Sequence, residues 1–205
     1  QAFVMEAYGL LMLQTGLDCT QAWKARLTQM SRFLCDCCGA HGETAIFGDD
    51  DSGKILDLGG RNVNDIHVVL QLMGCALDER YIDEPPCETI RWLTTPEEQR
   101  KNDKKPQYCS PLVSVRREGG YTILRSRDQA VLIALDHGPL GFGALAAHGH
   151  ADALSIQTFR NGKKILTDPG TWNYHLDKNL RNLFRSTAWH NTVCVTGRNQ
   201  SEMLG

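Results

Sequence analysis

Residues 153–167 read Ala-Leu-Ser-Ile-Gln-Thr-Phe-Arg-Asn-Gly-Lys-Lys-Ile-Leu-Thr, and this stretch decides the class of fold. Two short runs of strand-forming residues, 153–159 and 163–167, flank the dipeptide Asn161-Gly162. An Asn-Gly pair between two such runs is a strong signal for a two-residue β-hairpin, because the turn requires positive φ at both residues. The pattern therefore predicts an antiparallel hairpin in the C-terminal half of the chain.

Further strands are predicted on both sides of this hairpin. Tyr121–Arg125 and Ala130–Leu135 alternate with a period of two around the turn-prone residues 126–129, and Thr192–Thr196 ends at Gly197. Strands that follow one another with short turns pair antiparallel. We expect these strands to form an antiparallel sheet that is one half of a β-sandwich.

The N-terminal part of the chain is predicted to be helical. Between Ala22 and Cys37, apolar residues recur at helical spacing: Trp23, Leu27, Met30 and Leu34. Asp18 or Thr20 can act as the N-cap of this helix, and Gly39 is expected to end it. Two further helices are expected on apolar residues at similar spacing. One contains Phe3, Val4, Ala7, Leu10 and Leu11, and the other begins near Asn62 or Asn64 and includes Ile66, Val69, Leu70, Met73 and Leu77.

Between these two parts lies a stretch rich in proline and charge. Residues 78–110 contain Pro85-Pro86, Pro96 and Pro106 and a charged run over 97–105. We therefore expect an α+β multidomain chain, with helices over 1–77, a solvated connector over 78–110, and the first part of a β-sandwich domain over 111–205.

Composition excludes several classes of function. The chain has 22 basic and 24 acidic residues and a net charge of −2, which gives no electrostatic reason to bind nucleic acid or an anionic membrane face. No apolar run approaches the roughly 20 residues that span a bilayer. The chain starts at Gln1 without a methionine or a signal peptide, so we expect it to be a piece of a longer protein.

Eight cysteines and an acidic loop are weaker signals. Cys35-Asp-Cys-Cys38 lacks the second Cys pair or His pair of a zinc finger, so thiols near a helix end are favoured over a metal knot. The run Asp49-Asp-Asp-Ser-Gly53 lacks the glutamate that closes a calcium loop, since residue 60 is Gly. We interpret it as a solvated turn.

Histidine and aspartate meet in the sheet region. His148-Gly-His150-Ala-Asp152 is predicted to open a strand, and there residues two apart share a face. Asp168 ends the next strand, which the hairpin turn brings back toward residue 150, and His190 begins a third. Histidine and aspartate from adjacent strands are ligands of zinc or a similar divalent ion. The alternative is ordinary strand-end histidines, with Asp168 capping the Pro-Gly turn.

Several of these motifs together resemble the heparinase II/III-like polysaccharide lyases. The motifs occur in that family's order and approximate spacing: His148–Ser155, Asn161-Gly162, Thr167–Thr171, Phe184–Thr187, His190–Thr192, and Gly197 with Gln200-Ser-Glu202. The run Gly48–Gly53 with Leu56 also resembles a loop of the family's helical domain. The resemblance implies that the chain holds the C-terminal helices of an (α/α) toroid followed by an antiparallel β-sandwich.

The resemblance also implies roles for individual residues. His148 matches the catalytic histidine, and His150, Asp168 and His190 match the ligands of a metal, usually zinc. Tyr174 and Arg185 are candidate substrate contacts, although Arg185 is equally a candidate for a buried ion pair. The family also uses a tyrosine, with an Asn or His, from the toroid. Those groups are expected before Gln1, in the rest of the polypeptide.

The reaction that the resemblance implies is β-elimination on an anionic polysaccharide that contains uronic acid. Such an enzyme neutralises the carboxylate beside the α-proton before a base removes that proton. The family also implies a periplasmic or secreted location. Two alternatives stay open: a non-catalytic carbohydrate-binding or structural sandwich with a zinc site, and a metal-dependent hydrolase that uses the same ligands.

Overall fold

The computed structural model describes residues 2–50, 53, 55, 66–101, 105–141, 143 and 146–202. They divide into two compact units, one made of Gln1–Cys38 with Ser52–Ser110 and the other of Gly39–Asp51 with Pro111–Gly205. The second unit thus takes in residues 39–51, which sequence placed among the helices. This inserted segment supplies part of the site described below.

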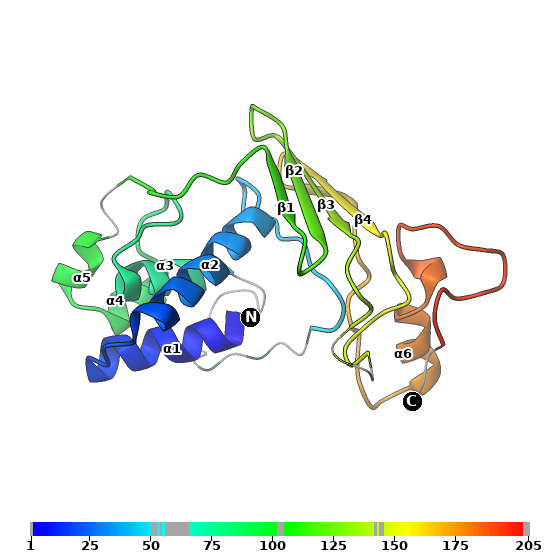
Figure 1. Ribbon diagram of the computed structural model, residues 1–205, viewed down its shortest axis with the longest axis horizontal. Coiled ribbons are helices and arrows are strands. Elements are labelled where there is room, and N and C mark those ends of the chain that lie inside the picture. The colour runs from blue at the N-terminus through cyan, green and yellow to red at the C-terminus, as the bar shows by residue number, and fades with distance from the viewer. Residues whose placement is uncertain are drawn as a thin grey trace. The chain divides into compact units, whose positions relative to one another are not determined.

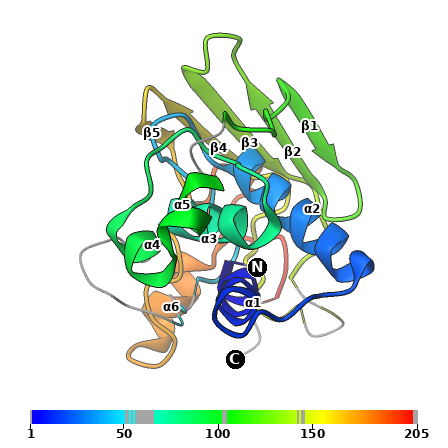
Figure 2. The same ribbon diagram turned by 90° about the vertical axis from the view of Figure 1, so that its left-hand side faces the viewer.

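Five helices make up the described part of the first unit (Figures 1 and 2). They are α1 (Ala2–Thr15), α2 (Gln21–Cys37), α3 (Ile66–Leu77), α4 (Glu88–Leu93) and α5 (Pro96–Lys101). The predicted start of the third helix, at Asn62 or Asn64, lies outside the described residues. Among the described residues, no helix has both the length and the apolar character needed to span a bilayer.

The prediction of α2 is confirmed, including its N-cap. The Thr20 hydroxyl accepts a hydrogen bond from the Trp23 amide at 3.4 Å, which satisfies one of the donors left free at a helix start. Leu27 and Leu34 are buried in the core of this unit, and Met30 packs against it. Trp23, at the edge of the predicted stripe, stacks on Tyr8 of α1 with ring centroids 5.0 Å apart.

The buried side of α1 differs from the predicted one. Met5 and Met12 enter the core, together with Leu70 and Met73 of α3, while Phe3, Val4 and Leu11 of the predicted stripe are exposed. Nearly every position of α1 carries an apolar or small residue, so the periodicity marks a helix without selecting its buried face.

The described part of the predicted connector contains two helices, α4 and α5, and contributes to a core. A second core cluster contains Cys87, the N-cap of α4, and Ile90 within that helix. Both are buried there with Leu72 and Cys75 of α3. The Cys87 amide also donates to the Gln71 side chain at 2.8 Å. Proline-rich and charged composition concealed this packing because only a few apolar residues carry it.

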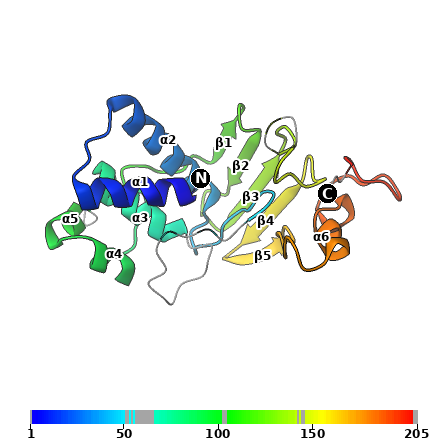
Figure 3. The ribbon, with the colours of Figure 1, turned by 90° about the horizontal axis from the view of Figure 1, so that it is seen from below.

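The second unit is built on a five-stranded antiparallel sheet, which confirms that part of the predicted fold (Figures 1 and 3). Its strands run in the order β1 (Val113–Arg116), β2 (Tyr121–Arg125), β3 (Val131–Asp136), β4 (Ile156–Arg160) and β5 (Lys163–Leu166). Each strand pairs with the one before it in sequence, so the sheet is a simple meander. The chain as described contains no toroid.

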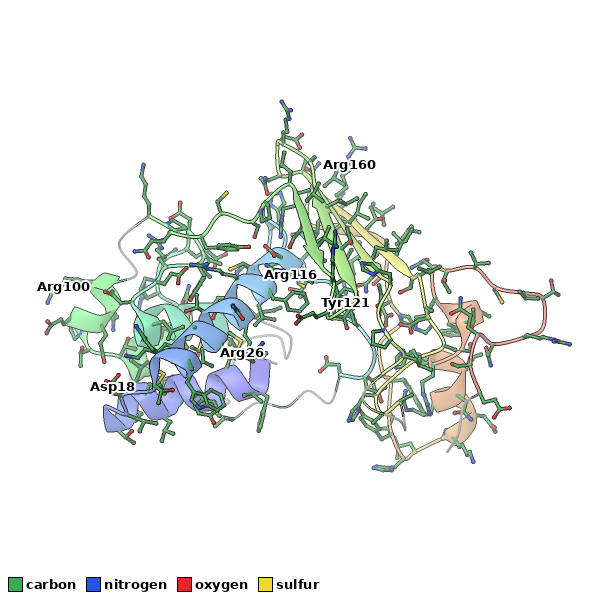
Figure 4. All side chains as sticks on the ribbon, in the orientation of Figure 1. Asp18, Arg26, Arg100, Arg116, Tyr121 and Arg160 are labelled. Carbon is green, nitrogen blue, oxygen red and sulfur yellow. The ribbon has the colours of Figure 1, made fainter. Side chains whose placement is uncertain are left out.

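The hairpin between β4 and β5 has the predicted turn. Asn161 and Gly162 have φ of +48° and +74°, and Arg160 pairs with Lys163 across the turn. The β1–β2 hairpin, in which Arg116 pairs with Tyr121 (Figure 4), was not predicted because Val113–Arg116 is too short to show a period.

The two faces of the sheet differ. One face buries the paired residues Ser114, Ile123, Ala134 and Gln157, with Leu132 and Phe159 beside them. Gln157 hydrogen-bonds the backbone of Ile46 through both its oxygen and its amide, so Ile46 of the inserted segment lies at this face. Val113 and Leu124 pair on the opposite face and are exposed, as is Leu166.

One predicted strand begins later than expected, since β4 starts at Ile156, and another is absent from the described residues. Residues 148–155 are an irregular segment, and His148 has φ of +61°. Residues 192–196 form no strand and pair with none that the structure describes, and Val193 is 72% exposed. The Gln200 amide donates to the Val193 carbonyl at 2.9 Å, which occupies a backbone group that a strand partner would use.

Two short helices in this region were not predicted. They are α6 (Lys178–Phe184) and a 3₁₀ turn at Thr187–Trp189. Asp177 caps α6 by accepting from the amides of Asn179 and Leu180, at 2.8 and 3.1 Å. Together α6 and the 3₁₀ turn carry the chain from the end of β5 back to the irregular segment, where the candidate site lies.

Candidate metal and catalytic site

Four buried side chains converge beside the ends of β4 and β5. His150, Asp152, Asp168 and His190 offer ligand atoms that all lie within 4.8 Å of one another. They come from the irregular segment before β4, the turn after β5 and the residue after the 3₁₀ turn. In the part of the chain that the structure describes, this is the one group of His, Cys, Asp and Glu with metal-ligand spacing.

Backbone contacts hold these segments together. The Ala151 amide donates to the Arg185 carbonyl at 2.9 Å, and the Thr187 hydroxyl donates to the Ala151 carbonyl at 2.6 Å. The Asn191 amide side chain donates to the Thr167 carbonyl at 2.9 Å. Residues 150, 168 and 190 therefore meet although no strand carries His150 or His190.

The hydrogen bonds on the outer side of each histidine set its tautomer. His190 Nδ1 lies 2.7 Å from the Ser186 carbonyl, which can only accept, so Nδ1 carries the proton. His150 Nε2 lies 2.9 Å from Asp49 Oδ1, and the same reasoning protonates Nε2. The inner nitrogens, His150 Nδ1 and His190 Nε2, lie 3.1 Å apart with their lone pairs directed into the cluster.

Two carboxylates complete the cluster. Asp168 Oδ2 lies 3.4 Å from His190 Nε2, while its Oδ1 accepts from the Gly170 amide at 2.7 Å. Burial raises the pKa of Asp168, and burial raises that of Asp152 to about 6 despite the opposing influence of His190 and His150. Each carboxylate therefore has an energetic reason to hold a cation or a proton.

These four residues fit a divalent metal ion. Two imidazole lone pairs and two carboxylates facing one another repel unless a positive charge lies among them, and nitrogen with oxygen donors suits zinc. The outer bonds of both histidines are the kind that orient metal-binding imidazoles. His150, Asp168 and His190 are the predicted ligands, and Asp152 joins them as a fourth candidate.

Asp49 is the site residue that the sequence interpretation missed. Its run was interpreted as a solvated turn, but the Asp49 side chain is 3% exposed and ion-paired to Arg181, with Arg181 Nη2 2.6 Å from Oδ2. Burial acts to raise the pKa of Asp49, but the His150 hydrogen bond and the Arg181 charge lower it to about 2. Asp49 is therefore a buried anion and not part of a solvated turn. The sequence could not show this, because its partner Arg181 lies far away in the chain.

His148, the predicted catalytic residue, lies at the exposed edge of this cluster. Its side chain is 59% exposed, and its Nδ1 lies 3.4 Å from Asp49 Oδ2. The Tyr174 hydroxyl is 3.5 Å from the same Nδ1, and the two rings meet edge to face. The positive φ of His148 is unusual for a residue with a Cβ and is typical of functional sites.

The two predicted substrate contacts lie in different settings. Tyr174 stands beside His148, with the Arg181 guanidinium 5.0 Å from its ring centroid. Arg185 is half-buried at the end of α6, and its Nε is buried without a hydrogen bond. The buried ion pair suggested for Arg185 is made instead by Arg181, one helical turn earlier.

The fold and cluster define a two-unit protein in which an antiparallel sheet carries a buried His/Asp site. Residues 111–205 match the family described as heparinase II/III-like, C-terminal. The family resemblance predicted from the motifs is therefore confirmed for residues 111–205, which match this family's C-terminal domain. No curated protein matches the sequence.

Several solved structures share the fold at low sequence identity. Heparinase III, the BT4657 gene product, is 20% identical with a TM-score of 0.61, over 88% of this chain and 25% of its own. The heparan sulfate lyase HepC of Pedobacter heparinus is 17% identical with a TM-score of 0.60, over 96% of this chain and 30% of its own. The chain thus spans less than a third of the length of these structures.

Proposed function

We propose that the protein of which this chain is a part is a polysaccharide lyase that cleaves a uronic-acid-containing polysaccharide by β-elimination. The observation that carries the proposal is the exposed His148, placed beside Tyr174 and Asp49 at the edge of a buried cluster with metal-ligand spacing. The names of the similar structures, heparinase III and heparan sulfate lyase, agree with this reaction class.

His148 suits the chemistry that this reaction needs. The base removes the proton α to the uronate carboxylate, the electron pair forms the new double bond, and the glycosidic oxygen at the β position leaves with a proton from an acid. An imidazole can neutralise the carboxylate or move a proton near pH 7. Tyr174 and Arg185 are proposed to contact the substrate.

A zinc ion is proposed at His150, Asp168 and His190, with Asp152 as the fourth ligand. When bound, zinc would supply positive charge that holds the three segments together. A lyase adds no water, so this site need not activate hydroxide. The residues themselves orient the segment that presents His148, since His148 is two residues before His150.

The remainder of the predicted fold is part of the same proposal. Helices of the first unit would complete an (α/α) toroid with the rest of the polypeptide, and the exposed apolar face around Val113 and Leu124 would be covered by a second sheet of a sandwich. The toroid would supply the missing tyrosine and its Asn or His partner. A periplasmic or secreted location stays a prediction.

The test is to incubate the full-length protein with alginate, heparan sulfate, hyaluronan and polyglucuronate while following the ultraviolet absorbance of unsaturated uronate. We expect absorbance to rise with one of them, and His148→Ala to lower kcat by about 10²–10⁴-fold, the usual contribution of acid–base catalysis. His137→Ala is the matched control: His137 is exposed in the same unit, and its ring meets the Thr122 hydroxyl at 2.9 Å.

Three outcomes would contradict the proposal. New reducing ends without absorbance would indicate a hydrolase, and equal activity of His148→Ala and His137→Ala would remove His148 from the mechanism. Absence of bound metal after purification without chelators would contradict the zinc site. Loss of activity in His148→Ala with metal content retained would separate catalysis from metal binding.

A further inference from the structure

Asp49 contacts three groups of the site at once. Its Oδ1 faces His150 Nε2 at 2.9 Å, its Oδ2 faces His148 Nδ1 at 3.4 Å, and Arg181 approaches both oxygens. We propose that Asp49 is a positioning residue that orients the metal-facing His150 and the exposed His148 together. This inference rests on the proposed function and adds a residue to it.

The contact with His150 determines which nitrogen faces the cluster. Asp49 accepts a hydrogen bond from the Nε2–H group, so Nδ1 is left as a lone pair toward His190 and Asp168. If the imidazole lost this partner, the Nδ1–H tautomer would place a proton where the metal binds. Removing the hydrogen-bond partner of a metal-binding histidine lowers metal affinity or activity by about 10- to 100-fold.

The contact with His148 acts in the same sense on the exposed ring. The second carboxylate oxygen lies nearest Nδ1, which favours a proton there and leaves Nε2 directed away from Asp49. The Tyr174 hydroxyl lies on the same Nδ1 side, 3.5 Å away. One carboxylate thus lies beside both rings, with Oδ1 nearest His150 and Oδ2 nearest His148.

The backbone around Asp49 is built for this contact. The Asp49 amide donates to the His148 carbonyl at 3.0 Å, so residues 49 and 148 are joined through backbone and side chain. Gly48 has φ of +62°, and a Cβ on it would lie 2.5 Å from the same carbonyl. The Asp50 amide donates to the Thr171 hydroxyl, which fixes the far side of the turn.

Arg181 explains how the carboxylate stays ionised among buried groups. Its side chain is 9% exposed and lies within hydrogen-bond distance of both Asp49 oxygens. If Asp49 served only to balance the charge of Arg181, its contacts with His148 and His150 would not affect metal binding or catalysis. Positioning and charge balance therefore predict different results when both charges are removed.

The experiment compares Asp49→Asn and the double variant Asp49→Asn/Arg181→Met in the full-length protein. Zinc affinity is measured by competition with a chelator, the metal site by the visible spectrum of the cobalt-substituted protein, and kcat and KM at saturating zinc. For Asp49→Asn we expect zinc affinity and kcat each to fall about 10- to 100-fold, with KM within about twofold.

The double variant separates the two roles. Removing both members of a buried ion pair is often neutral for stability, so this variant should fold even if Asp49→Asn does not. It should keep the losses in zinc affinity and kcat. Glu79→Gln is the matched control, because Glu79 pairs with Arg32 at 2.8 Å in the other unit, and it should change neither quantity.

Each contrary result identifies what is wrong. If the double variant regains wild-type zinc affinity and kcat, Asp49 only balances the charge of Arg181 and the inference fails. If kcat at saturating zinc is unchanged, the part concerning His148 fails. If the wild-type protein cleaves no polysaccharide, the proposed function fails, while zinc affinity and the cobalt spectrum still decide whether Asp49 orients His150.

Discussion

Asp152 and Asp168 are buried carboxylates close to two imidazoles, an arrangement that a protein does not keep for stability alone. Burial raises the pKa of both, that of Asp152 to about 6. Buried acidic groups with raised pKa values mark sites where a cation or a proton is held. With the proposed metal ion absent, we expect the cost of burying these carboxylates to lower the stability of the fold.

We predict that the metal-free protein becomes less stable as the pH rises from 4 to 6.5. The folded state keeps the Asp152 proton up to about pH 6, whereas the unfolded chain releases it near 3.8. The folded state binds more protons in this window, so stability falls as pH rises. Asp49 contributes little and in the opposite direction, because its pKa is lowered to about 2 and its carboxylate is largely ionised in both states above about pH 5.

Asp152→Asn provides the comparison, because an amide cannot titrate. With chelator present, urea unfolding of the two proteins at pH 4 and 6.5 should show the wild type losing up to about 3 kcal/mol relative to the variant, the size of a two-unit pKa shift. A difference that is the same at both pH values would show that Asp152 has no raised pKa.

At the scale of elements, the segment 39–51 joins the irregular segment before β4 through a close backbone approach. Gly48 combines a left-handed backbone with a carbonyl 2.5 Å from where its Cβ would be. Only glycine meets both conditions without strain. The position of Asp49, and with it the contact to His150, depends on this residue.

We predict that Gly48→Ala lowers the free energy of unfolding by about 2–3 kcal/mol and weakens zinc binding. Gly16→Ala is the control, because Gly16 has φ of +66° with no atom within 4 Å of its Cβ position. It should cost only about 1 kcal/mol, the backbone part of the effect, and leave zinc binding unchanged. If both variants lose the same free energy of unfolding, the backbone around Gly48 moves to accept the added Cβ, and the close approach to His148 is not rigid.

At the scale of the whole molecule, the site belongs to one of the two compact units. Its ligands lie within residues 148–190 and its outer partner Asp49 within 39–51, all in the second unit. Helices α2 and α3 have their own core, built on Leu27, Leu70 and Met73. Loss of metal should therefore act on the two units unequally.

Hydrogen exchange of the full-length protein, with and without chelator, checks this prediction. We expect faster exchange in peptides covering 148–152, 167–171 and 185–191 and unchanged protection in α2 and α3, since structure tied to metal opens when the metal leaves. Uniform loss of protection would show that the units unfold as one. Unchanged exchange at residues 148–152 would contradict a metal at His150.

Sequence predicted best those features whose signal lies within a few neighbouring residues. The α2 helix and the Asn161-Gly162 hairpin were predicted because their spacing, cap and turn residues lie within a few positions of one another. His150, Asp168 and His190 were brought together as expected, although β4 begins six residues after His150 and no described strand begins at His190. The motifs, and not the assumed period of two, carried that inference.

Sequence alone determined the order of helices before strands, the antiparallel hairpin and the group of histidines and aspartate, because each depends on neighbouring residues or on a motif. The tertiary structure decided which face of α1 is buried, that Asp152 joins the cluster, and that Asp49 pairs with Arg181, 132 residues away. Such contacts depend on which distant segments pack together. Burial then turns part of an acidic turn into an ion pair that contacts two histidines.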